Sequence, residues 1–287
     1  MSRVLVTGAA GQVGREVVAR LESHGRHDVV AATRDDLDVG DRDAVLGAVT
    51  ALRPDLVVHT AAWTAVDACE ADPDRALRDN ALAVRHVVDG CRRVGAHLVA
   101  VSTDYVFDGT KATPYTEWDT PAPASVYGHS KLGGEREALD AGIGATVVRT
   151  SWVCGEHGAN MVKTVLRLAA TTDGPLRFVD DQVGHPTFAD DLAAMLVRLG
   201  TDRRPGLFHV TNQGATSWYG FVRSILAAAG HDPGRVEPIR TADLDPPRPA
   251  PRPANSVLDD VALRLSGLPV LPHYRESLDR VVAALTA

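Results

Sequence analysis

The chain has 287 residues, of which 45% are hydrophobic, so it can bury a full core and exceeds the common domain size of roughly 100–200 residues. Its 30 basic and 37 acidic residues give a net charge of -7, which repels phosphate backbones and anionic membrane surfaces. We therefore expect no nucleic-acid partner and no membrane partner.

The three cysteines, Cys69, Cys91 and Cys154, are an odd number at wide spacing, which gives neither a disulfide framework nor a zinc-ligand pattern. No uncharged apolar run approaches the roughly 20 residues that span a bilayer. The sequence pattern is that of a strand from the first residues, so we expect no signal peptide. We therefore expect a cytoplasmic protein with reduced thiols.

The first half of the chain alternates apolar runs with helical patterns. Strands are predicted at 4–6, 28–32, 56–60, 97–102 and 145–150, and helices at 11–24, 41–53 and 74–94. This order predicts an α/β fold, a doubly wound parallel sheet of the Rossmann type over residues 1–150. Ligands of such sheets lie beyond the carboxyl ends of the strands.

Beyond about Thr150 the alternation is less regular. Helices are predicted at 160–170, 190–199, 217–229 and 274–285, and a short strand at 207–210. We expect residues 151–287 to form mainly a smaller C-terminal substrate-binding domain, with some segments that return to the first domain. The proline-rich stretch 246–253 is typical of a disordered linker by composition alone.

A glycine-rich turn follows the first predicted strand. Gly8, Gly11 and Gly14 have the spacing GxxGxxG and open a predicted helix, so bare backbone and a helix N-terminus would face a pyrophosphate. This spacing is typical of short-chain dehydrogenases. The alternative interpretation is a tight strand-to-helix turn without a ligand.

The second predicted strand ends at Thr33 and Arg34, where enzymes that use NAD carry an acidic residue for the ribose 2′-hydroxyl. A guanidinium there can pair with the 2′-phosphate of NADP. The sequence therefore favours NADPH, with NADH possible because Asp35 and Asp36 lie nearby. A solvated surface arginine is the alternative.

Three residues predict acid–base chemistry. Thr103 follows a predicted strand, and Tyr127 and Lys131 are four residues apart, on one face of a predicted helix. A nearby ammonium would lower the pKa of the tyrosine, and the threonine hydroxyl would bond the substrate oxygen. A packed ring beside a solvated lysine is the usual alternative, but the glycine turn upstream favours catalysis.

The sequence resembles the dTDP-4-dehydrorhamnose reductase family of extended short-chain dehydrogenases. The resemblance extends over nearly the whole chain and rests on the blocks 8–14, 58–67, 102–109, 127–135, 149–153, 181–187 and 252–259. It implies reduction of the C4 keto group of dTDP-4-dehydro-β-L-rhamnose to dTDP-β-L-rhamnose, with a proton from Tyr127. It also implies that the proline-rich stretch is ordered.

The resemblance also implies binding residues. The cofactor would contact Gly8, Gly11, Gln12, Val13, Arg34, Asp38, Val39, Ala61, Ala62, Trp63, Tyr127 and Lys131. Thr103, Asp104 and Trp152 would touch the sugar, although an aromatic residue such as Trp152 more commonly serves as a core anchor. Sugar-nucleotide 4,6-dehydratases, which are similar, have Asp-Glu after the threonine. Here Asp104 is followed by Tyr105, which argues for a reduction without dehydration.

Two departures from the family pattern stand out. Cys154 replaces a common tyrosine near Trp152. Some members dimerise around a magnesium ion held by glutamates; here Glu16 matches, Asp190 is shorter and Arg275 replaces a third carboxylate. We expect no metal, and the sequence leaves a monomer or a homodimer open.

Two alternative functions remain open at this stage. One is another nucleotide-sugar 4-ketoreductase of deoxysugar biosynthesis, because product stereochemistry depends on how the ketose lies against the cofactor. The other is a non-catalytic NADP-binding regulatory subunit, which fold alone would not exclude. The three catalytic candidates favour an enzyme.

Overall fold

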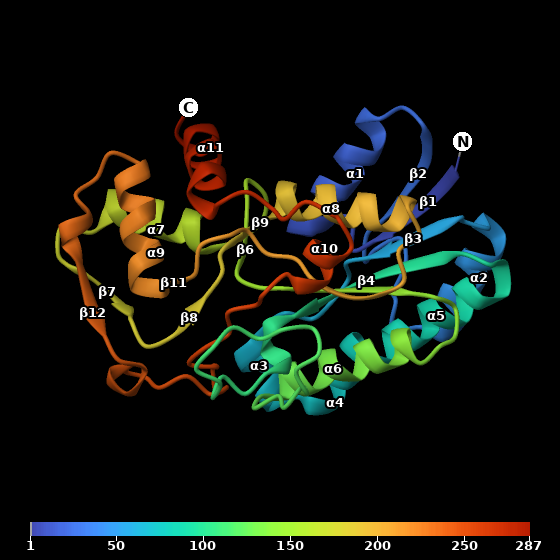
Figure 1. Cartoon of the computed structure of the whole chain (residues 1–287), viewed down its shortest axis with the longest axis horizontal. Helices are drawn as coiled ribbons and strands as arrows, with labels where there is room; N and C mark the ends of the chain where they lie inside the picture. The colour runs from blue at the N-terminus through green and yellow to red at the C-terminus, as the bar shows by residue number, and fades with distance from the viewer. Residues whose placement is uncertain (1) are drawn as a thin grey trace.

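The computed structural model describes residues 2–287 and is built around a six-stranded parallel sheet in the order β10-β5-β4-β3-β1-β2 (Figure 1). The strands are β1 (Ser2–Thr7), β2 (His27–Ala32), β3 (Leu56–His59), β4 (His97–Thr103), β5 (Thr146–Thr150) and β10 (Gly206–His209). The predicted Rossmann-type α/β fold is confirmed. β10 lies far along the chain and extends the sheet beside β5.

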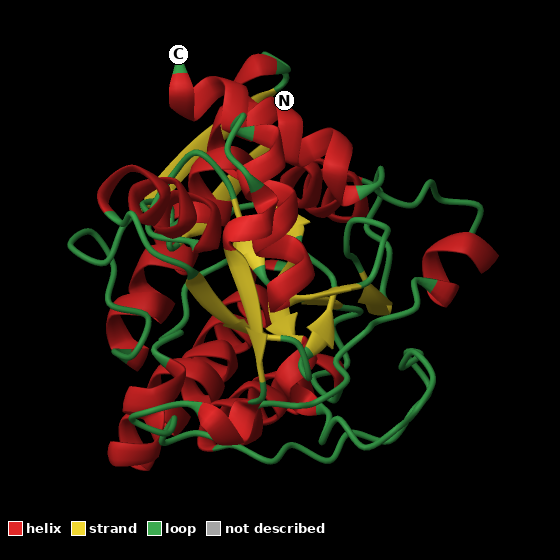
Figure 2. Ribbon diagram, turned by 90° about the vertical axis from the view of Figure 1, so that its left-hand side faces the viewer, coloured by secondary structure: helices red, strands yellow, loops and turns green. Residues whose placement is uncertain are grey.

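Helices cover both faces of this sheet (Figure 2). Successive side chains of β1, such as Val4 and Leu5, lie in two different cores because neighbouring side chains of a strand point to opposite faces. One core includes α1 (Gln12–Ser23) and α8 (Ala189–Thr201); the other includes α2 (Arg42–Leu52), α5 (Ala83–Val94) and α6 (Val126–Leu139). Burial on both faces explains the continuous apolar runs of the strands.

A second lobe, at the left of Figure 1, contains α7 (Met161–Thr171), α9 (Trp218–Ala228) and α11 (Tyr274–Thr286) around a third core. Asn160 and Ser217, where two of the predicted helices begin, are the N-caps of α7 and α9, and each side chain accepts a backbone N–H. Three short strand pairs escaped prediction because such short strands carry too little periodicity: β7 (Leu176–Val179) with β12 (Val236–Ile239), β6 (Val153–Cys154) with β9 (Thr187–Phe188), and β8 (Val183–Gly184) with β11 (Thr216–Ser217).

The single helix predicted at 74–94 is wrong in detail. The chain forms α3 (Val66–Ala71), α4 (Pro73–Leu77), a π-helical turn at Arg78–Leu82 and then α5. Asn80 lies within the π turn, where its Oδ1 accepts the N–H of Trp63 and its Nδ2 donates to the Trp63 carbonyl and to Ser130 Oγ. These bonds join the turn to the segment after β3 and to α6, and π turns occur frequently at functional sites.

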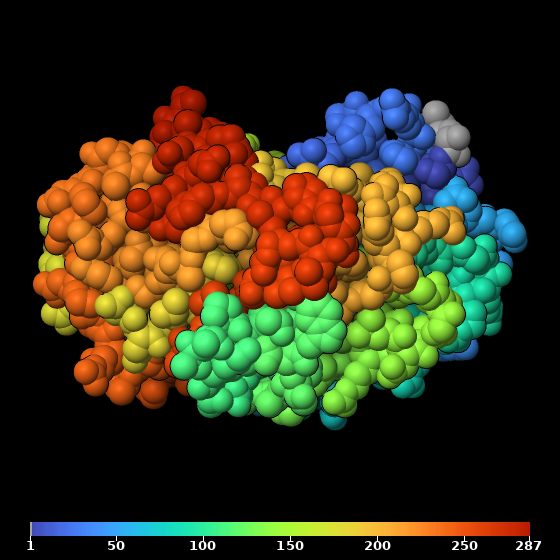
Figure 3. Space-filling view, viewed as in Figure 1, coloured from blue at the N-terminus to red at the C-terminus, as the bar shows by residue number. Residues whose placement is uncertain are grey.

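The proline-rich stretch is held against the Rossmann lobe. Arg252 pairs with both carboxylate oxygens of Asp67, at 2.5 and 2.8 Å, and Asn255 Nδ2 donates to the Lys111 carbonyl at 2.7 Å. Figure 3 shows the green segment that follows β4 lying beside the orange-red segment that includes these residues. The linker interpretation from composition is therefore wrong, because ion pairs and backbone bonds replace the contacts that proline cannot make.

The remaining regular elements are short. They are α10 (Val261–Leu265) and the 3₁₀ turns at Asp104–Val106, Pro233–Arg235 and Thr241–Asp243. No helix within residues 2–287 is both long enough and apolar enough to cross a membrane.

Candidate active site

The glycine turn joins β1 to α1 through close backbone contacts. Gly8 adopts a φ of 72°, and a Cβ there would lie 2.6 Å from the Ala61 nitrogen. A Cβ on Gly14 would lie 2.2 Å from the Gly8 carbonyl oxygen. Gly11 caps α1 without a side-chain bond and no acidic residue lies in the first turn. The helix N-terminus is therefore bare and suited to a phosphate group.

A cavity of about 260 Å³ lies beside this turn. Eight of the residues predicted to bind the cofactor line it: Gly8, Gly11, Arg34, Asp38, Val39, Ala61, Ala62 and Trp63. The structure thus brings the turn, the end of β2 and the end of β3 around one space.

Arg34 is exposed at the rim of this cavity, and no carboxylate within residues 2–287 pairs with it. The neighbouring Asp36 accepts bonds from Thr33 N at 2.9 Å and Thr33 Oγ1 at 2.6 Å, which hold the pKa of its carboxyl below the usual value. Because Asp36 is engaged with Thr33, the Arg34 guanidinium remains available for a phosphate.

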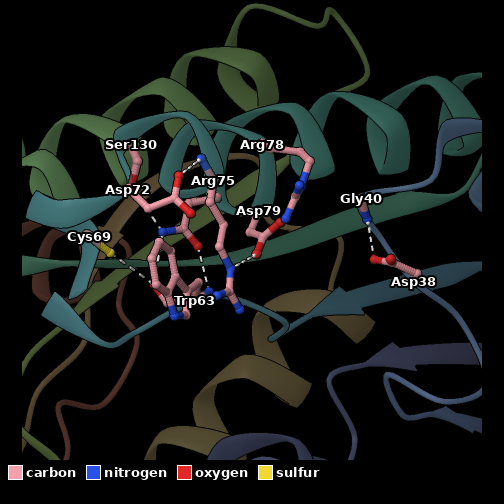
Figure 4. A network of polar contacts seen from close by, with 10 residues as sticks. Asp38, Gly40, Trp63, Cys69, Asp72, Arg75, Arg78, Asp79 and Ser130 are labelled. Atoms are coloured by element: carbon pink, nitrogen blue, oxygen red, sulfur yellow. Dashed lines mark hydrogen bonds and ion pairs between the residues drawn. The ribbon is translucent and has the colours of Figure 1, made fainter.

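The far wall of this cavity is a small ionic network (Figure 4). The Arg75 guanidinium lies 4.2 Å from the centre of the Trp63 ring, and Asp79 accepts from Arg75 Nε at 3.3 Å and Arg78 Nε at 2.9 Å. Asp79 itself lines the cavity. Sequence reasoning missed these residues, although Arg75 and Asp79 have the four-residue spacing of a helical ion pair.

A second cavity, of about 420 Å³, continues from the first, since Gly11, Thr60 and Ala62 line both. It collects the remaining predicted residues: Gln12, Val13, Thr103, Asp104, Tyr127, Lys131 and Trp152. The two cavities together contain every predicted site residue, and the catalytic candidates lie in the second one.

Tyr127 and Lys131 lie one turn apart on α6, whose N-cap Ser125 accepts the Gly128 N–H at 3.1 Å. Tyr127 is 7% exposed, with its ring edge against Tyr105. Lys131 Nζ donates to the Val101 carbonyl at 2.7 Å. Burial lowers the pKa of Lys131 to about 8, against the opposing charge of Glu135.

The net pKa of Tyr127 is raised in this structure, whereas the sequence predicted a pKa lowered by Lys131. Burial raises the pKa of the Tyr127 phenol well above its usual value, and a hydrogen bond with Thr103 opposes the shift only in part. The ammonium of Lys131 is instead held by the Val101 carbonyl. The phenol is therefore protonated at neutral pH, the form that a proton donor needs.

Thr103 and Asp104 lie at the carboxyl end of β4. Thr103 Oγ1 donates to Asp104 Oδ1 at 3.0 Å, while Asp104 Oδ2 has no hydrogen-bond partner within residues 2–287. Asp104 is 1% exposed. Burial raises its pKa to about 6, against the opposing effect of the Ser256 and Thr103 hydroxyls. An unpaired buried carboxylate oxygen beside the cavity is suited to accept a ligand hydroxyl.

Trp152 follows β5 in the left-handed region, with a φ of 44°, which is uncommon for a bulky residue and stores strain at functional sites. Its indole stacks on Trp218, with centroids 3.6 Å apart and planes 8° apart. Both rings line the second cavity. Sequence reasoning missed Trp218; its place directly after the cap Ser217 was the only available signal.

The two departures from the family pattern have different structural settings. Cys154 is buried in the core of the second lobe, and its Sγ donates to the Trp152 carbonyl at 3.4 Å. Asp190 pairs with Arg280 at 2.9 Å, and Glu16 lies 3.7 Å from His157 Nε2. Within residues 2–287 no three His, Cys, Asp or Glu side chains group as a metal site would require.

Known proteins match this chain along its length. A family model described as the RmlD substrate binding domain covers residues 2–287, and a dTDP-4-dehydrorhamnose reductase from Streptomyces griseus is 42% identical over 99% of this chain and 94% of its own. The chain belongs to the dTDP-4-dehydrorhamnose reductase family.

Two further similar proteins extend the comparison. The crystal structure of dTDP-4-dehydrorhamnose reductase from Bacillus anthracis in complex with NADP is 35% identical in sequence and has a TM-score of 0.94. The match covers 99% of each of the two chains. A probable dTDP-4,6-dihydroxy-2-methyloxan-3-one 4-ketoreductase from Streptomyces antibioticus is 43% identical over 96% of this chain and 93% of its own. Similar family members thus differ in the named sugar.

Proposed function

We propose that this protein uses NADPH to reduce the C4 keto group of dTDP-4-dehydro-β-L-rhamnose, giving dTDP-β-L-rhamnose. The observation that carries the proposal is that Thr103, Tyr127 and Lys131 line one cavity that continues into the glycine-turn cavity. A non-catalytic NADP-binding subunit would have no need for a buried, protonated phenol at this place.

The first cavity fits a dinucleotide. The bare N-terminus of α1 and the backbone of Gly8 and Gly11 would hold the pyrophosphate, and Arg34 would pair with the 2′-phosphate that distinguishes NADPH. A Cβ on Gly8 would collide with the Ala61 backbone at 2.6 Å, so position 8 tolerates no side chain. When bound, NADPH supplies the hydride. The Bacillus anthracis relative with NADP supports the choice of cofactor.

The chain's own residues supply the proton and orient the ketone. Tyr127 donates its phenolic proton to the C4 oxygen, and the Thr103 hydroxyl donates a hydrogen bond to the same oxygen. Lys131, buried below them, favours the phenolate that forms once the proton has left. Asp104 Oδ2 accepts a sugar hydroxyl, and the Trp152 ring covers a face of the sugar.

Dehydration is not part of this proposal. Asp104 is followed by Tyr105, whose ring packs edge-on against Tyr127 with centroids 5.5 Å apart, so an aromatic ring stands where dehydratases carry a second carboxyl group. Incubation of the purified protein with dTDP-glucose and NAD should yield no 4-keto sugar. Formation of that product would contradict this assignment.

The direct test supplies purified protein and NADPH with dTDP-4-dehydro-β-L-rhamnose and identifies the product sugar by NMR. The expected product is dTDP-β-L-rhamnose. Tight NADPH binding without turnover of any 4-keto-6-deoxysugar would point to the regulatory alternative instead.

A second candidate is reduction of another dTDP-linked 4-keto-6-deoxysugar. The Streptomyces antibioticus relative, named for a different sugar, is as similar to this chain as the rhamnose enzyme of Streptomyces griseus, with identities of 43% and 42%. A parallel assay with dTDP-4-dehydro-6-deoxy-D-glucose separates the candidates, because the preferred substrate has the larger kcat/KM.

We infer that the enzyme acts in the cytoplasm as a monomer or homodimer. Support for a reducing compartment comes from Cys69, Cys91 and Cys154, which are all free thiols buried in three different cores. Light scattering of the purified protein would distinguish one copy from two.

A further inference from the structure

A buried ion pair lies directly behind the catalytic residues. Arg149 and Glu135 form two parallel bonds, Nε to Oε1 at 2.8 Å and Nη2 to Oε2 at 2.7 Å. Their side chains are only 3% and 2% exposed. Glu135 lies one turn after Lys131 on α6, and Arg149 lies near the end of β5, three residues before Trp152. The pair therefore ties the catalytic helix to the strand that leads to the substrate cavity.

The same carboxylate also holds the strand that carries Thr103. Ser102 Oγ donates to Glu135 Oε1 at 2.6 Å, and Ser102 lines the second cavity next to Thr103. Ser102 and Arg149 are register partners on β4 and β5, and Arg149 and His209 are partners on β5 and β10. One carboxylate thus joins the carboxyl ends of two strands to α6.

The rest of the Arg149 guanidinium is also fixed. Nη1 lies 3.5 Å from His209 Nε2, and the guanidinium carbon lies 5.0 Å from the centre of the Phe107 ring. Burial lowers the pKa of His209 to about 3, so the ring is neutral and accepts at Nε2 while Nδ1 donates to the Asp259 carbonyl. Arg149 therefore has little rotational freedom.

A contribution to folding stability does not by itself explain the buried Glu135–Arg149 pair. Moving two charges into a protein interior costs several kcal/mol per ion, and an apolar pair of similar volume is often as stable. A charged pair that is fully bonded and directed at Ser102 has a geometric effect that apolar side chains cannot supply, because only an acceptor orients the serine hydroxyl.

We propose that Glu135 and Arg149 are positioning residues for the reduction: through Ser102, the pair fixes Thr103 relative to Tyr127 and Lys131. This inference rests on the proposed function, because its effect is measured through reduction of the keto sugar. Small misplacements of reacting groups slow catalysis by up to about 100-fold, so loss of the pair should lower kcat without preventing folding.

The test replaces both charges at once. In the variant Glu135→Leu with Arg149→Met, neither charge is left unpaired, so the melting temperature should stay within about 5 °C of wild type. We expect kcat to fall by about 10- to 100-fold while the Kd for NADPH, measured by titration, stays within about twofold, since the glycine turn is untouched.

The chain offers a matched control on the same helix. Arg85 pairs with Glu137 through two bonds, at 2.8 and 2.5 Å, but this pair is partly exposed and lines neither cavity. The variant Glu137→Leu with Arg85→Met should retain wild-type kcat. An equal loss in both double variants would overturn the inference, because it would show a general effect of altering α6.

A rescue variant separates positioning from packing. Glu135→Gln with Arg149→Met removes both charges but keeps an amide oxygen that can accept from Ser102, so it should recover most of the lost kcat. Should the double variants fold poorly, Ser102→Ala cuts the same link with the ion pair intact and should lower kcat with unchanged NADPH binding.

The outcomes separate this inference from the proposed function. Wild-type kcat in Glu135→Leu with Arg149→Met, or in Ser102→Ala, would overturn the positioning role while leaving the reductase assignment intact. Absence of keto-sugar reduction by the wild-type protein would overturn the proposed function instead.

Discussion

The glycine turn and the substrate cavity are built in different ways. The turn, which borders the cofactor cavity, is shaped by its backbone, since Gly8 and Gly14 make contacts that no side chain would permit. The substrate cavity is formed by large and ionisable side chains, including the strained Trp152 and the unpaired Asp104. A shared cofactor demands one backbone shape, whereas a particular sugar is selected by side chains, where local strain and unpaired groups are concentrated.

The largest expected effect is a loss of turnover caused by a substitution in the substrate cavity. Tyr127→Phe keeps the packed ring but removes the phenolic proton, so kcat should fall by about 10²–10⁴-fold, while NADPH binding remains near wild type. Tyr115→Phe is the matched control, because Tyr115 is also buried and bonded through its hydroxyl, to Asp108 at 2.9 Å, outside both cavities. Near-normal turnover in Tyr127→Phe would refute the assigned proton donor.

A second prediction concerns the unpaired carboxyl of Asp104. Its pKa of about 6 in the folded protein exceeds the usual 3.8, so the folded state binds the proton more tightly and wild-type stability falls as pH rises from about 4 to about 6. A shift of this size corresponds to at most about 3 kcal/mol. Asp104→Asn should therefore gain stability relative to wild type as the pH rises from 4.5 to 7.5.

Denaturant unfolding at both pH values measures this effect, and a second variant is the control. Asp36 has a lowered pKa because of its bonds with Thr33, so its contribution to stability is already present above about pH 4.5 and is lost only at lower pH; Asp36→Asn should therefore keep a constant stability difference from wild type between about pH 4.5 and 7.5. Parallel pH trends in the two variants would contradict the account of Asp104.

A third prediction concerns NADPH affinity and the backbone of the glycine turn. A Cβ on Gly14 would lie 2.2 Å from the Gly8 carbonyl oxygen, so Gly14→Ala must displace the turn, at a cost of about 1–3 kcal/mol. NADPH affinity should fall correspondingly. Gly47→Ala is the control, since nothing lies within 4 Å of a Cβ there, and that helix should gain about 0.5–1 kcal/mol. Unchanged NADPH affinity in Gly14→Ala would show that the turn is less constrained than the structure indicates.

A fourth prediction, of similar size, concerns the Arg34 guanidinium at the rim of the cofactor cavity. Arg34→Ala should weaken NADPH binding by about tenfold or more, the value of one charge-assisted contact of roughly 1.5–3 kcal/mol. NADH has no 2′-phosphate and should bind equally well to both proteins, as measured by fluorescence titration. An equal loss for both cofactors would remove Arg34 from phosphate recognition.

The cofactor side could be predicted from the sequence because its determinants are local. The glycine spacing, the end of β2 and the spacing of Tyr127 and Lys131 each lie within a few consecutive residues. The partner of Lys131 could not be predicted, because Val101 lies on another element and its carbonyl is a backbone group. The division of the chain near residue 150 and the roles of the individual site residues stay predictions.

The substrate side depends on long-range contacts that leave no local pattern. Trp152 meets Trp218 across the two lobes, Ser102 meets Glu135, and the π turn at Asn80 follows from bonds to Trp63 and Ser130. Each pair is distant in sequence, and each member alone resembles an ordinary core or surface residue. Only the folded chain shows that they converge.

Transfer of a labelled hydride tests the central claim most directly. The purified protein would be given dTDP-4-dehydro-β-L-rhamnose and NADPH with deuterium at both C4 positions of the nicotinamide, and the product would be analysed by NMR and mass spectrometry. We predict dTDP-β-L-rhamnose with one deuterium, at C4 of the sugar. A sugar without deuterium, or label in a sugar of different C4 configuration, would contradict the proposed reaction.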